Sequence, residues 1–319
     1  MTTPITIPPT SLTTLTNKTI LITGGSSGIG LATAHLLLSL SPQNNISILD
    51  LHPPPPSSPL TSPSNTHRTH YHKCNVTSWP SQRAGFAATI SRFGRIDAVF
   101  VNAGISEYGE QFFTDDLEGG EKARVLKEPD RRVVDVDLQA AGDTVKLAIY
   151  WMRKTLRRER DGSGSGGESR VGSIVMTASL AGYLASVGGP GYSAAKHGII
   201  GLMRALKHDT APLNIAISIV APGITITPLL ASTTTTPEQS AAEVSKRGVP
   251  VNKAETVALA VAYLMDLGMK GNGMGLLVQG DKTVDVEAGL ARTRELWMGR
   301  EMVEMFRGGR GVRVFENKL

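Results

Sequence analysis

Cysteine is almost absent from this chain. Cys74 is the single cysteine among 319 residues, so no disulfide can form within the molecule. Aromatic residues make up 5% of the sequence, and no apolar run approaches the ~18 residues of a membrane-spanning helix. Residues 1–17 carry no charged side chain and lack the features of a signal or transit peptide. These absences argue against a disulfide scaffold and a membrane protein, and we expect a cytoplasmic protein in a reducing compartment.

The excess of positive charge is small and scattered. The formal net charge is +5 and the pI is about 9.3, a balance that can indicate a nucleic-acid partner. The densest basic run lies within residues 153–160, where Glu159 interrupts it and Asp161 follows it, as on the solvated end of a helix. We therefore expect no nucleic-acid partner.

Short, β-rich apolar runs alternate with helical segments along most of the chain. This order is typical of a parallel sheet with helices on both faces. It predicts one α/β domain of the doubly wound Rossmann type over residues 18–290, with a mainly parallel seven-stranded sheet. The predicted strands are 19–23, 46–50, 71–76, 97–102, 173–177, 215–221 and 274–278, and the predicted helices are 31–40, 79–93, 130–158 and 192–210.

Four segments are expected to lie outside this regular core. Residues 1–17, rich in Thr and Pro, are interpreted as a loose tail. The Pro-rich segment 53–67 and the Gly-rich segment 158–170 are interpreted as surface insertions, because their composition disfavours regular elements. Residues 291–319 form a C-terminal extension.

A glycine-rich loop follows the first predicted strand. Glycines there let the backbone approach a pyrophosphate, and the N-terminus of the next helix offers unpaired N–H groups. The spacing is G-x-x-x-G-x-G, so it differs from the common dinucleotide fingerprint, and a plain strand–helix turn is the alternative. The predicted phosphate-binding residues are Gly24, Ser26, Ser27, Gly28, Ile29 and Gly30.

Asp50 ends the second predicted strand, 20 residues after Gly30. A carboxylate there accepts hydrogen bonds from the ribose hydroxyls of NAD and repels the 2′-phosphate of NADP. We therefore predict NAD as the cofactor, with NADP as the alternative. A solvated turn aspartate is the other interpretation, and His52, Arg68 or Lys73 folding back would favour NADP.

Tyr192 and Lys196 are four residues apart, so they share one face of the predicted helix. A lysine ammonium beside a phenol stabilises the phenolate, which can take a proton from an alcohol. Ser179 follows the fifth predicted strand, where its hydroxyl can hydrogen-bond a substrate oxygen. Alone, the Tyr/Lys pair would be an amphipathic surface helix, and Ser179 a turn residue.

Taken together, the motifs resemble the short-chain dehydrogenase/reductase family. They occur in the family's order and span about residues 18–285. The matching segments are Thr23–Gly30, Asn102–Gly104, Ser179, Tyr192–Lys196 and Pro222–Thr227.

The resemblance implies further contacts with the cofactor. Asn102, Ala103 and Gly104 would support its central part, and Tyr192 and Lys196 would line it, with Lys196 binding the nicotinamide ribose. Asn75 and Val76 would flank the adenine, where the side-chain amide of Asn75 would bond the ring's amino group. The loop that would hold the nicotinamide carboxamide contains Pro222, Gly223, Thr225 and Thr227. No metal ligand is assigned.

Asp137 departs from the family pattern. The family usually has Asn at the matching position of the long helix, where a helix irregularity lets it help hold a water that connects the lysine to solvent. An aspartate near Lys196 would raise the pKa of that lysine. Asp137 is therefore the fourth candidate catalytic residue, with an exposed side chain as the alternative.

Four further segments, residues 99–105, 202–206, 284–290 and 295–299, carry a narrower resemblance. They are similar to fungal secondary-metabolism members of the family, of the 5′-hydroxyaverantin dehydrogenase and, more distantly, 15-hydroxyprostaglandin dehydrogenase kind. This similarity implies interconversion of a secondary alcohol and a ketone on a small, fairly apolar, natural-product-like substrate. A non-redox dehydration or cyclisation on the same fold, and a non-catalytic dinucleotide-binding regulator, are the alternatives. Family members usually pair through the long helices, so we expect a homodimer or homotetramer.

Three loops are expected to form the substrate wall, each following one of the motifs. The first loop contributes Ile105, Ser106 and Tyr108, and the second contributes Tyr183 and Leu184. The third covers residues 229–249 and is a candidate lid.

Overall fold

The computed structural model describes residues 4–107, 109, 111–112, 128–160, 170–184, 186–231 and 234–308, without the side chains of 156–160. Its sheet has the strand order β3-β2-β1-β4-β5-β6-β7-β8. The strands are β1 (Thr19–Thr23), β2 (Asn45–Asp50), β3 (Thr69–Lys73), β4 (Ala98–Val101), β5 (Gly172–Thr177), β6 (Ile215–Pro222), β7 (Gly275–Gln279) and β8 (Lys282–Asp285). Every pairing is parallel except that of β7 with β8, which confirms the doubly wound class.

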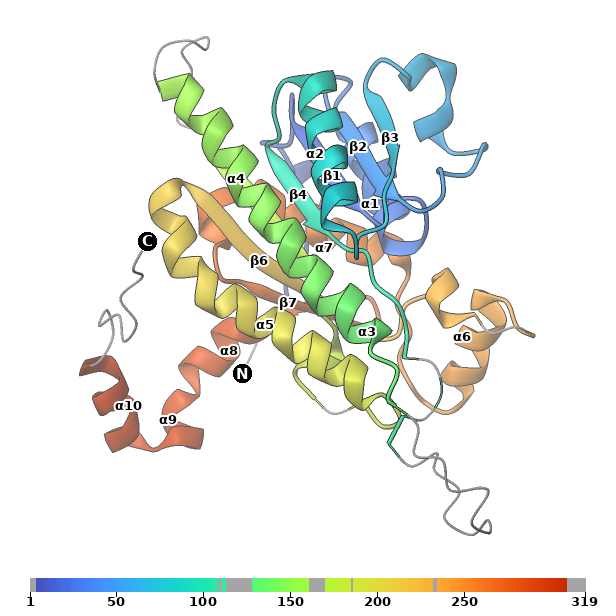
Figure 1. The fold of residues 1–319 in the computed structure, drawn as a ribbon. Helices are drawn as coiled ribbons and strands as arrows, with labels where there is room; N and C mark the ends of the chain where they lie inside the picture. Colours follow the sequence, from blue (N-terminus) through green and yellow to red (C-terminus); the bar gives the residue numbers. More distant parts are fainter. Residues whose placement is uncertain are drawn as a thin grey trace.

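Helices cover both faces of this sheet (Figure 1). The helices are α1 (Gly28–Leu40), α2 (Trp79–Phe93), α3 (Arg132–Val134), α4 (Ala141–Arg160), α5 (Pro190–Thr210), α6 (Pro237–Lys246), α7 (Ala254–Asp266), α8 (Val286–Arg292), α9 (Arg294–Met298) and α10 (Arg300–Gly308). One core lies between the sheet and α1 with α7, and the other between the sheet and α2, α4 and α5. The strands between these cores are continuous apolar runs because both of their faces are buried.

The sheet has eight strands, whereas we predicted seven. The eighth, β8, folds back on β7 through a two-residue turn at Gly280 and Asp281, whose φ angles are +56° and +57°. A two-residue hairpin turn of this type needs positive φ angles at both central residues, and Gly280 followed by Asp281 adopts them. The prediction stopped at Val278 because residues 279–283 are mostly polar.

The N-terminal segment corrects the expectation of a loose tail. From Ile5 onward the chain lies against the sheet edge and α7, with Leu12 and Leu15 buried. The N–H of Ile5 donates to Thr283 O (2.7 Å), and that of Thr14 donates to Asp266 Oδ1 (2.8 Å). Apolar side chains at intervals in a Thr/Pro-rich segment are enough to hold it in place.

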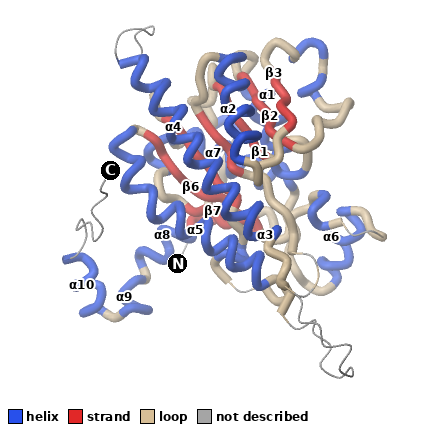
Figure 2. Tube along the Cα trace, viewed as in Figure 1, coloured by secondary structure: helices blue, strands red, loops and turns tan. Residues whose placement is uncertain are grey.

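The other expected non-core segments lie at the surface where described. Residues 53–67 form two short 3₁₀ turns, Pro59–Thr61 and Pro63–Asn65, and Leu60 anchors them in the core. Residues 161–169 of the second insertion and 309–319 of the C-terminal extension lie outside the described residues. The rest of that extension forms α9 and α10, which project from the body beyond α8 (Figure 2).

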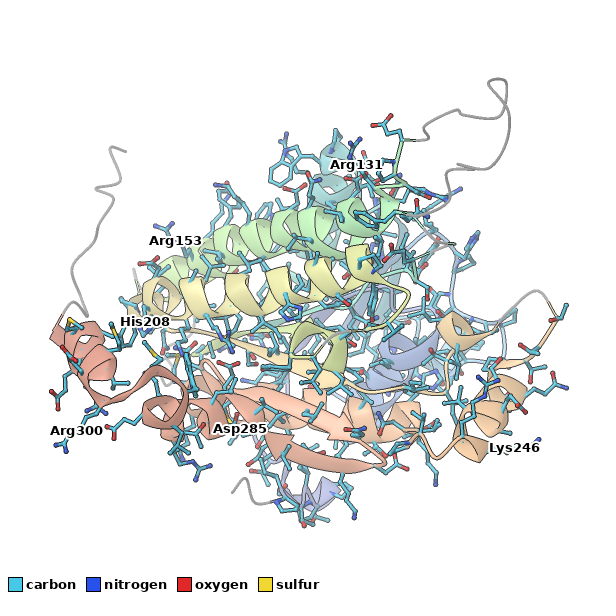
Figure 3. All side chains as sticks on the ribbon, turned by 90° about the horizontal axis from the view of Figure 1, so that it is seen from below. Arg131, Arg153, His208, Lys246, Asp285 and Arg300 are labelled. Atoms are coloured by element: carbon cyan, nitrogen blue, oxygen red, sulfur yellow. The ribbon has the colours of Figure 1, made fainter. Side chains whose placement is uncertain are left out.

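Basic side chains are spread over several elements. Arg131, Arg153, Lys246 and Arg300 lie before α3, on α4, on α6 and on α10, at separate places around the molecule (Figure 3). Within the described part of the chain, none of the helices combines the length and apolar character that crossing a bilayer requires.

Candidate active site

The glycine-rich loop joins β1 to α1 at the carboxyl edge of the sheet. Gly24 and Gly28 have positive φ angles, and a Cβ on Gly30 would overlap the carbonyl oxygen of Gly24. The helix N-cap, Ser27, makes no side-chain hydrogen bond to the first turn. First-turn N–H groups without a capping side chain, at the positive end of a helix dipole, fit a pyrophosphate. The residues present therefore fit the dinucleotide that the sequence predicts.

Asp50 lies beside this loop at the end of β2. Its Oδ2 accepts the N–H of Ser26 (3.0 Å), and the hydroxyl of Ser26 donates to His52 O (2.6 Å). Arg68 is turned elsewhere, because its guanidinium donates to Leu38 O (2.9 Å) at the C-terminal end of α1. Lys73 is the register partner of Asp50 on β3 and is exposed. Asp50 thus stands where a ribose acceptor is expected, and Lys73 is the nearest basic residue along the register.

Asn75 is exposed and its amide oxygen is already engaged. Asn75 Oδ1 accepts the N–H (3.0 Å) and the Oγ1–H (2.8 Å) of Thr77, which closes a local turn. An adenine amino group needs an acceptor, so the expected contact requires this turn to open. In the described arrangement the amide NH₂ is the group left to face a base.

Asn102 connects three strands at the centre of the site. Its side-chain NH₂ donates to Gly24 O (3.0 Å), and its amide oxygen accepts from Thr177 Oγ1 (3.1 Å). Its backbone N–H donates to Thr23 Oγ1 (3.0 Å). Sequence reasoning assigned no role to the hydroxyl of Thr23 or to Thr177, although both are polar residues that end core strands. Together they fix the positions of Asn102, Ala103 and Gly104 against the glycine loop.

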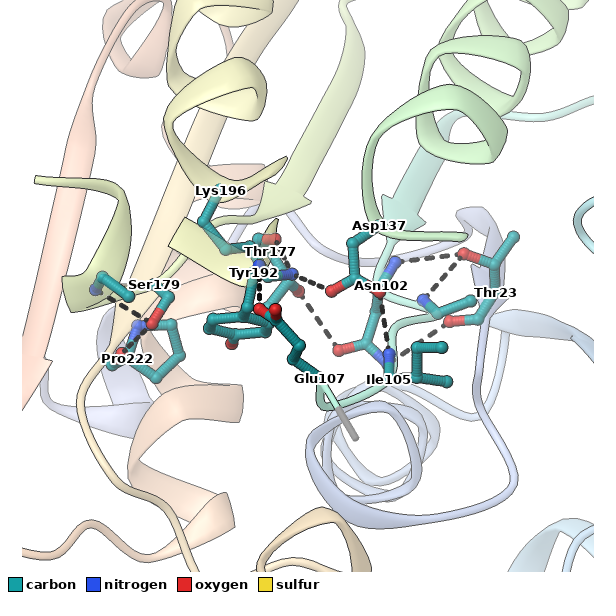
Figure 4. Close-up of polar contacts among 12 residues, drawn as sticks. Thr23, Asn102, Ile105, Glu107, Asp137, Thr177, Ser179, Tyr192, Lys196 and Pro222 are labelled. Carbon is teal, nitrogen blue, oxygen red and sulfur yellow. Dashed lines mark hydrogen bonds and ion pairs between the residues drawn. The ribbon is translucent and has the colours of Figure 1, made fainter. Parts of the chain in front are cut away.

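Asp137 and Lys196 form a buried ion pair beside Asn102 (Figure 4). Lys196 Nζ lies 3.0 Å from Asp137 Oδ2 and donates to Thr177 O (3.1 Å); the two side chains are 5% and 1% exposed. Burial alone would lower the pKa of Lys196, but the Asp137 carboxylate and the Tyr192 phenol outweigh it and raise that pKa. The pair therefore holds Lys196 as an ammonium ion, and the alternative of an exposed Asp137 is wrong.

A π-helical turn, Asp135–Ala140, sets the direction of Asp137. It separates α3 from α4, so the segment predicted as one long helix contains the irregularity that the family resemblance implied. The wider turn brings Asp137 Oδ1 to the N–H of Ile105 (2.8 Å), so one carboxylate bridges Lys196 and the loop after β4. π-turns of this kind concentrate at functional sites.

Tyr192 and Lys196 lie on the same face of α5, as their spacing predicts. Lys196 Nζ is 5.4 Å from the centre of the Tyr192 ring. Ser179 follows β5, where its Oγ accepts the N–H of Ala181 (3.1 Å) and donates to Pro222 O (3.4 Å). Figure 4 shows Ser179 on one side of Tyr192 and the Lys196–Asp137 pair on the other. The structure thus brings together all four predicted catalytic residues.

Glu107 is a further charged residue at this site. Its Oε2 accepts the backbone N–H of Tyr192 (2.8 Å), as Figure 4 shows. The sequence offers no local signal for this contact, because the two residues are 85 positions apart.

The loop after β6 lies across the glycine loop. A Cβ on Gly28 would lie 3.1 Å from Thr227 Cβ. Thr225 is buried, and its Oγ1 donates to Gly223 O (3.0 Å). Asn252, which sequence reasoning missed, supports this loop: its carbonyl accepts the N–H of Ile226 (3.0 Å). The predicted carboxamide loop, Pro222 to Thr227, is therefore in contact with the predicted phosphate loop.

Of the residues expected to form the substrate wall, those that the structure describes do not all face the site. Leu184 and Leu229 are exposed beside the site, and the candidate lid contains the regular helix α6, which begins with a capping box at Thr236. Tyr183 instead points away: its hydroxyl donates to Glu287 Oε1 (2.9 Å), and burial raises its pKa. Tyr108 lies outside the described residues.

Comparisons with known proteins agree with this geometry. The family model described as short chain dehydrogenase matches residues 18–238. Short-chain dehydrogenase/reductase prx4 of Penicillium rubens is 34% identical over 303 residues, covering 89% of this chain and 81% of the relative. 5′-Hydroxyaverantin dehydrogenase stcG of Emericella nidulans is 30% identical over 305 residues, covering 91% and 92%. The resemblance inferred from the motifs is confirmed.

A solved structure shows the same fold. The crystal structure of levodione reductase superimposes with a TM-score of 0.64 at 28% sequence identity, covering 83% of this chain and 97% of that one.

Proposed function

The chain belongs to the short-chain dehydrogenase family, whose Rossmann fold implies a nicotinamide dinucleotide cofactor, and we propose that it oxidises a secondary alcohol to a ketone, reversibly, with NAD⁺. The observation that carries this proposal is the buried Lys196 ammonium beside Tyr192, at the sheet edge where the glycine loop lies. A charged lysine in that place has a direct chemical use, which is to stabilise a phenolate.

The chain's own residues handle the proton and the substrate oxygen. The Ser179 hydroxyl hydrogen-bonds the alcohol oxygen and directs it at Tyr192. The Tyr192 phenolate takes the hydroxyl proton as the carbonyl forms, and Lys196 stabilises that phenolate before transfer. A nicotinamide dinucleotide held by the glycine loop would supply the acceptor for the hydride that leaves the carbon bearing the hydroxyl. The reverse sequence reduces the ketone, with Tyr192 returning the proton.

Asp137 acts on this chemistry through Lys196. Its carboxylate offsets the cost of burying the ammonium and fixes Nζ between Asp137 and Thr177 O. We propose that it takes the place of the family's usual Asn, with a charge in addition to an oxygen.

Two observations favour NAD⁺ over NADP⁺. The Asp50 carboxylate stands beside the glycine loop, where it would repel a 2′-phosphate. Arg68, one of the residues that could bind that phosphate, is held by carbonyl groups at the end of α1. Lys73, the register partner of Asp50, is the lysine of the adjacent strand.

The substrate proposed is small, uncharged and fairly apolar. Leu184 and Leu229 are exposed and follow Ser179 and Thr227 closely in the chain, and the hydroxyl of Ser106 donates to Leu229 O (3.5 Å). The similarity to a protein named 5′-hydroxyaverantin dehydrogenase favours a secondary-metabolite alcohol. We also propose that the chain works in the cytoplasm as a homo-oligomer pairing through α4 and α5, where Tyr150 is exposed.

Calorimetric titration with NAD⁺ and NADP⁺ separately tests the cofactor assignment. We expect the wild type to bind NAD⁺ more tightly than NADP⁺. In Asp50→Ala the difference between the two affinities should become smaller, whereas Lys73→Ala should change the NAD⁺ affinity little. Preferential binding of NADP⁺ would overturn the assignment of Asp50. Product analysis with and without NAD⁺ then separates net oxidation from a dehydration or cyclisation.

A further inference from the structure

The catalytic helix begins without a cap of its own. The N-cap of α5 is Gly189, which has no side chain, and Pro190 follows as its first helical residue. The first-turn N–H groups of a helix need a partner from elsewhere or from water. Glu107 supplies one from a distant loop: its Oε2 accepts the N–H of Tyr192 at 2.8 Å.

The neighbouring glycines leave room for this carboxylate. A Cβ on Gly191 would lie 3.3 Å from Glu107 Oε2 and 3.2 Å from Val133 Cγ1, closer than side chains ordinarily pack. A negative charge at a helix N-terminus is also stabilised by the helix dipole. Glu107 therefore caps α5 from a distant loop, a role that an Asp or Ser at the N-cap position usually performs.

The loop that carries Glu107 also carries the residues assigned to the cofactor. Asn102, Ala103 and Gly104 follow β4, and the N–H of Ile105 is held by Asp137 Oδ1 (2.8 Å). Two residues later, Glu107 holds Tyr192. Two carboxylates thus connect the same short loop to the two ends of the catalytic pair, Asp137 through Lys196 and Glu107 through Tyr192.

Resting on the proposed function, we propose that Glu107 is a positioning residue for Tyr192, and that it couples the cofactor-supporting loop to the catalytic helix. Glu107 sets the first turn of α5 so that the phenol stays in line with Ser179 and the dinucleotide. Ordering of the loop 102–107 by a bound dinucleotide is transmitted to Tyr192 through this hydrogen bond.

The kinetic test compares three substitutions at Glu107. Glu107→Ala and the shorter Glu107→Asp lose the contact, whereas Glu107→Gln keeps a carbonyl acceptor. The free energy lost with a helix cap corresponds to a change of up to about tenfold in a rate or equilibrium constant. We therefore expect kcat to fall about tenfold in Glu107→Ala and Glu107→Asp, with the KM for the dinucleotide nearly unchanged. Gln should retain most of kcat, and Glu304→Ala, an exposed carboxylate on α10, serves as the matched control.

Hydrogen exchange measures the contact without relying on turnover. In the wild type the Tyr192 amide should exchange slowly and more slowly still with NAD⁺ bound. In Glu107→Ala it should exchange at least about tenfold faster, with no further slowing on NAD⁺ addition. The proposal would be overturned if the Tyr192 amide exchanged at the wild-type rate in Glu107→Ala, or if kcat fell as far in Glu107→Gln as in Glu107→Ala. If the wild type protects this amide yet turns over no alcohol, the proposed function fails while the capping contact stands.

Discussion

Lys196 carries its charge in a place where an isolated ammonium would be costly. It is nearly fully buried, and its compensation comes from Asp137 at 3.0 Å and from Thr177 O. Burial lowers the pKa of Lys196, whereas Asp137 and Tyr192 raise it by more, and the net direction is upward. Because the folded-state pKa is raised, the stability gained is present below the ordinary lysine pKa and is lost as pH rises through the folded value.

Asp137→Asn tests this balance. Removing the carboxylate leaves only the Tyr192 phenol to oppose the effect of burial, so the pKa of Lys196 should fall and the alkaline limb of the kcat/KM profile should move down by about one pH unit or more. The free energy of unfolding should fall by roughly 3 kcal/mol at neutral pH, as for other broken buried pairs. Asp143→Asn on α4, which is only half-buried, is the control. An unmoved alkaline limb would show that Asp137 does not keep Lys196 charged.

The relative placement of single residues could be predicted where the signal is local spacing. Tyr192 and Lys196 are one helical turn apart, and the glycines of the loop follow a strand directly, so both sets are visible in the sequence. Glu107, Thr23 and Thr177 were missed because their partners lie 75 to 85 positions away, at a distance only the fold closes. The oxygen of Asn75 was assigned to a base, whereas a local turn with Thr77 already uses it.

At the scale of elements, the glycine loop depends on close contact between its own residues. A Cβ on Gly30 would overlap Gly24 O, so Gly30→Ala should displace the loop and weaken dinucleotide binding at least about a hundredfold, a loss of about 2.7 kcal/mol. Gly142→Ala on α4 is the matched control, because a Cβ there meets nothing within 4 Å and Ala favours a helix. Calorimetric titration with NAD⁺ measures both; equal affinity of the two variants would contradict the assignment of the loop.

Element types were well predicted and their details less so. α2 was predicted at Trp79–Phe93, where the structure has it; there Ser78 caps its start and Gly94 ends it. Side-chain periodicity predicted one long helix before β5, since it barely changes across one wide turn, and only the family resemblance implied the irregularity seen there as a π-turn. β8 was missed because a four-residue edge strand has little apolar character of its own.

At the scale of the whole molecule, the N-terminal segment belongs to the folded unit. Leu15 is buried against the face covered by α1 and α7, so Leu15→Ala should lower the free energy of unfolding by about 2–5 kcal/mol. Leu296→Ala on α9 is the control, because that side chain is 86% exposed. Denaturant unfolding measures both, and equal stability of the two variants would mean that residues 4–17 do not contribute to the core.

Residues 1–17 were interpreted as a loose tail because a Thr/Pro-rich composition is, on average, typical of irregular segments. Thr and Pro dominate residues 1–17, yet three apolar side chains within them are enough to seat the segment on a surface made by α7 and β8. The surface that receives this segment exists only in the complete fold, so a local sequence pattern could not predict it.

The central claim is that Tyr192, held by Lys196, performs the proton transfer of an NAD⁺-dependent alcohol oxidation. Its most direct test is Tyr192→Phe, assayed by formation of reduced nicotinamide on a panel of secondary alcohols and by NAD⁺ affinity. The account predicts that kcat falls about 10³-fold, in the range for losing a general base, while NAD⁺ affinity stays within about threefold. A Phe variant that turns over an alcohol within about tenfold of the wild-type rate would contradict it.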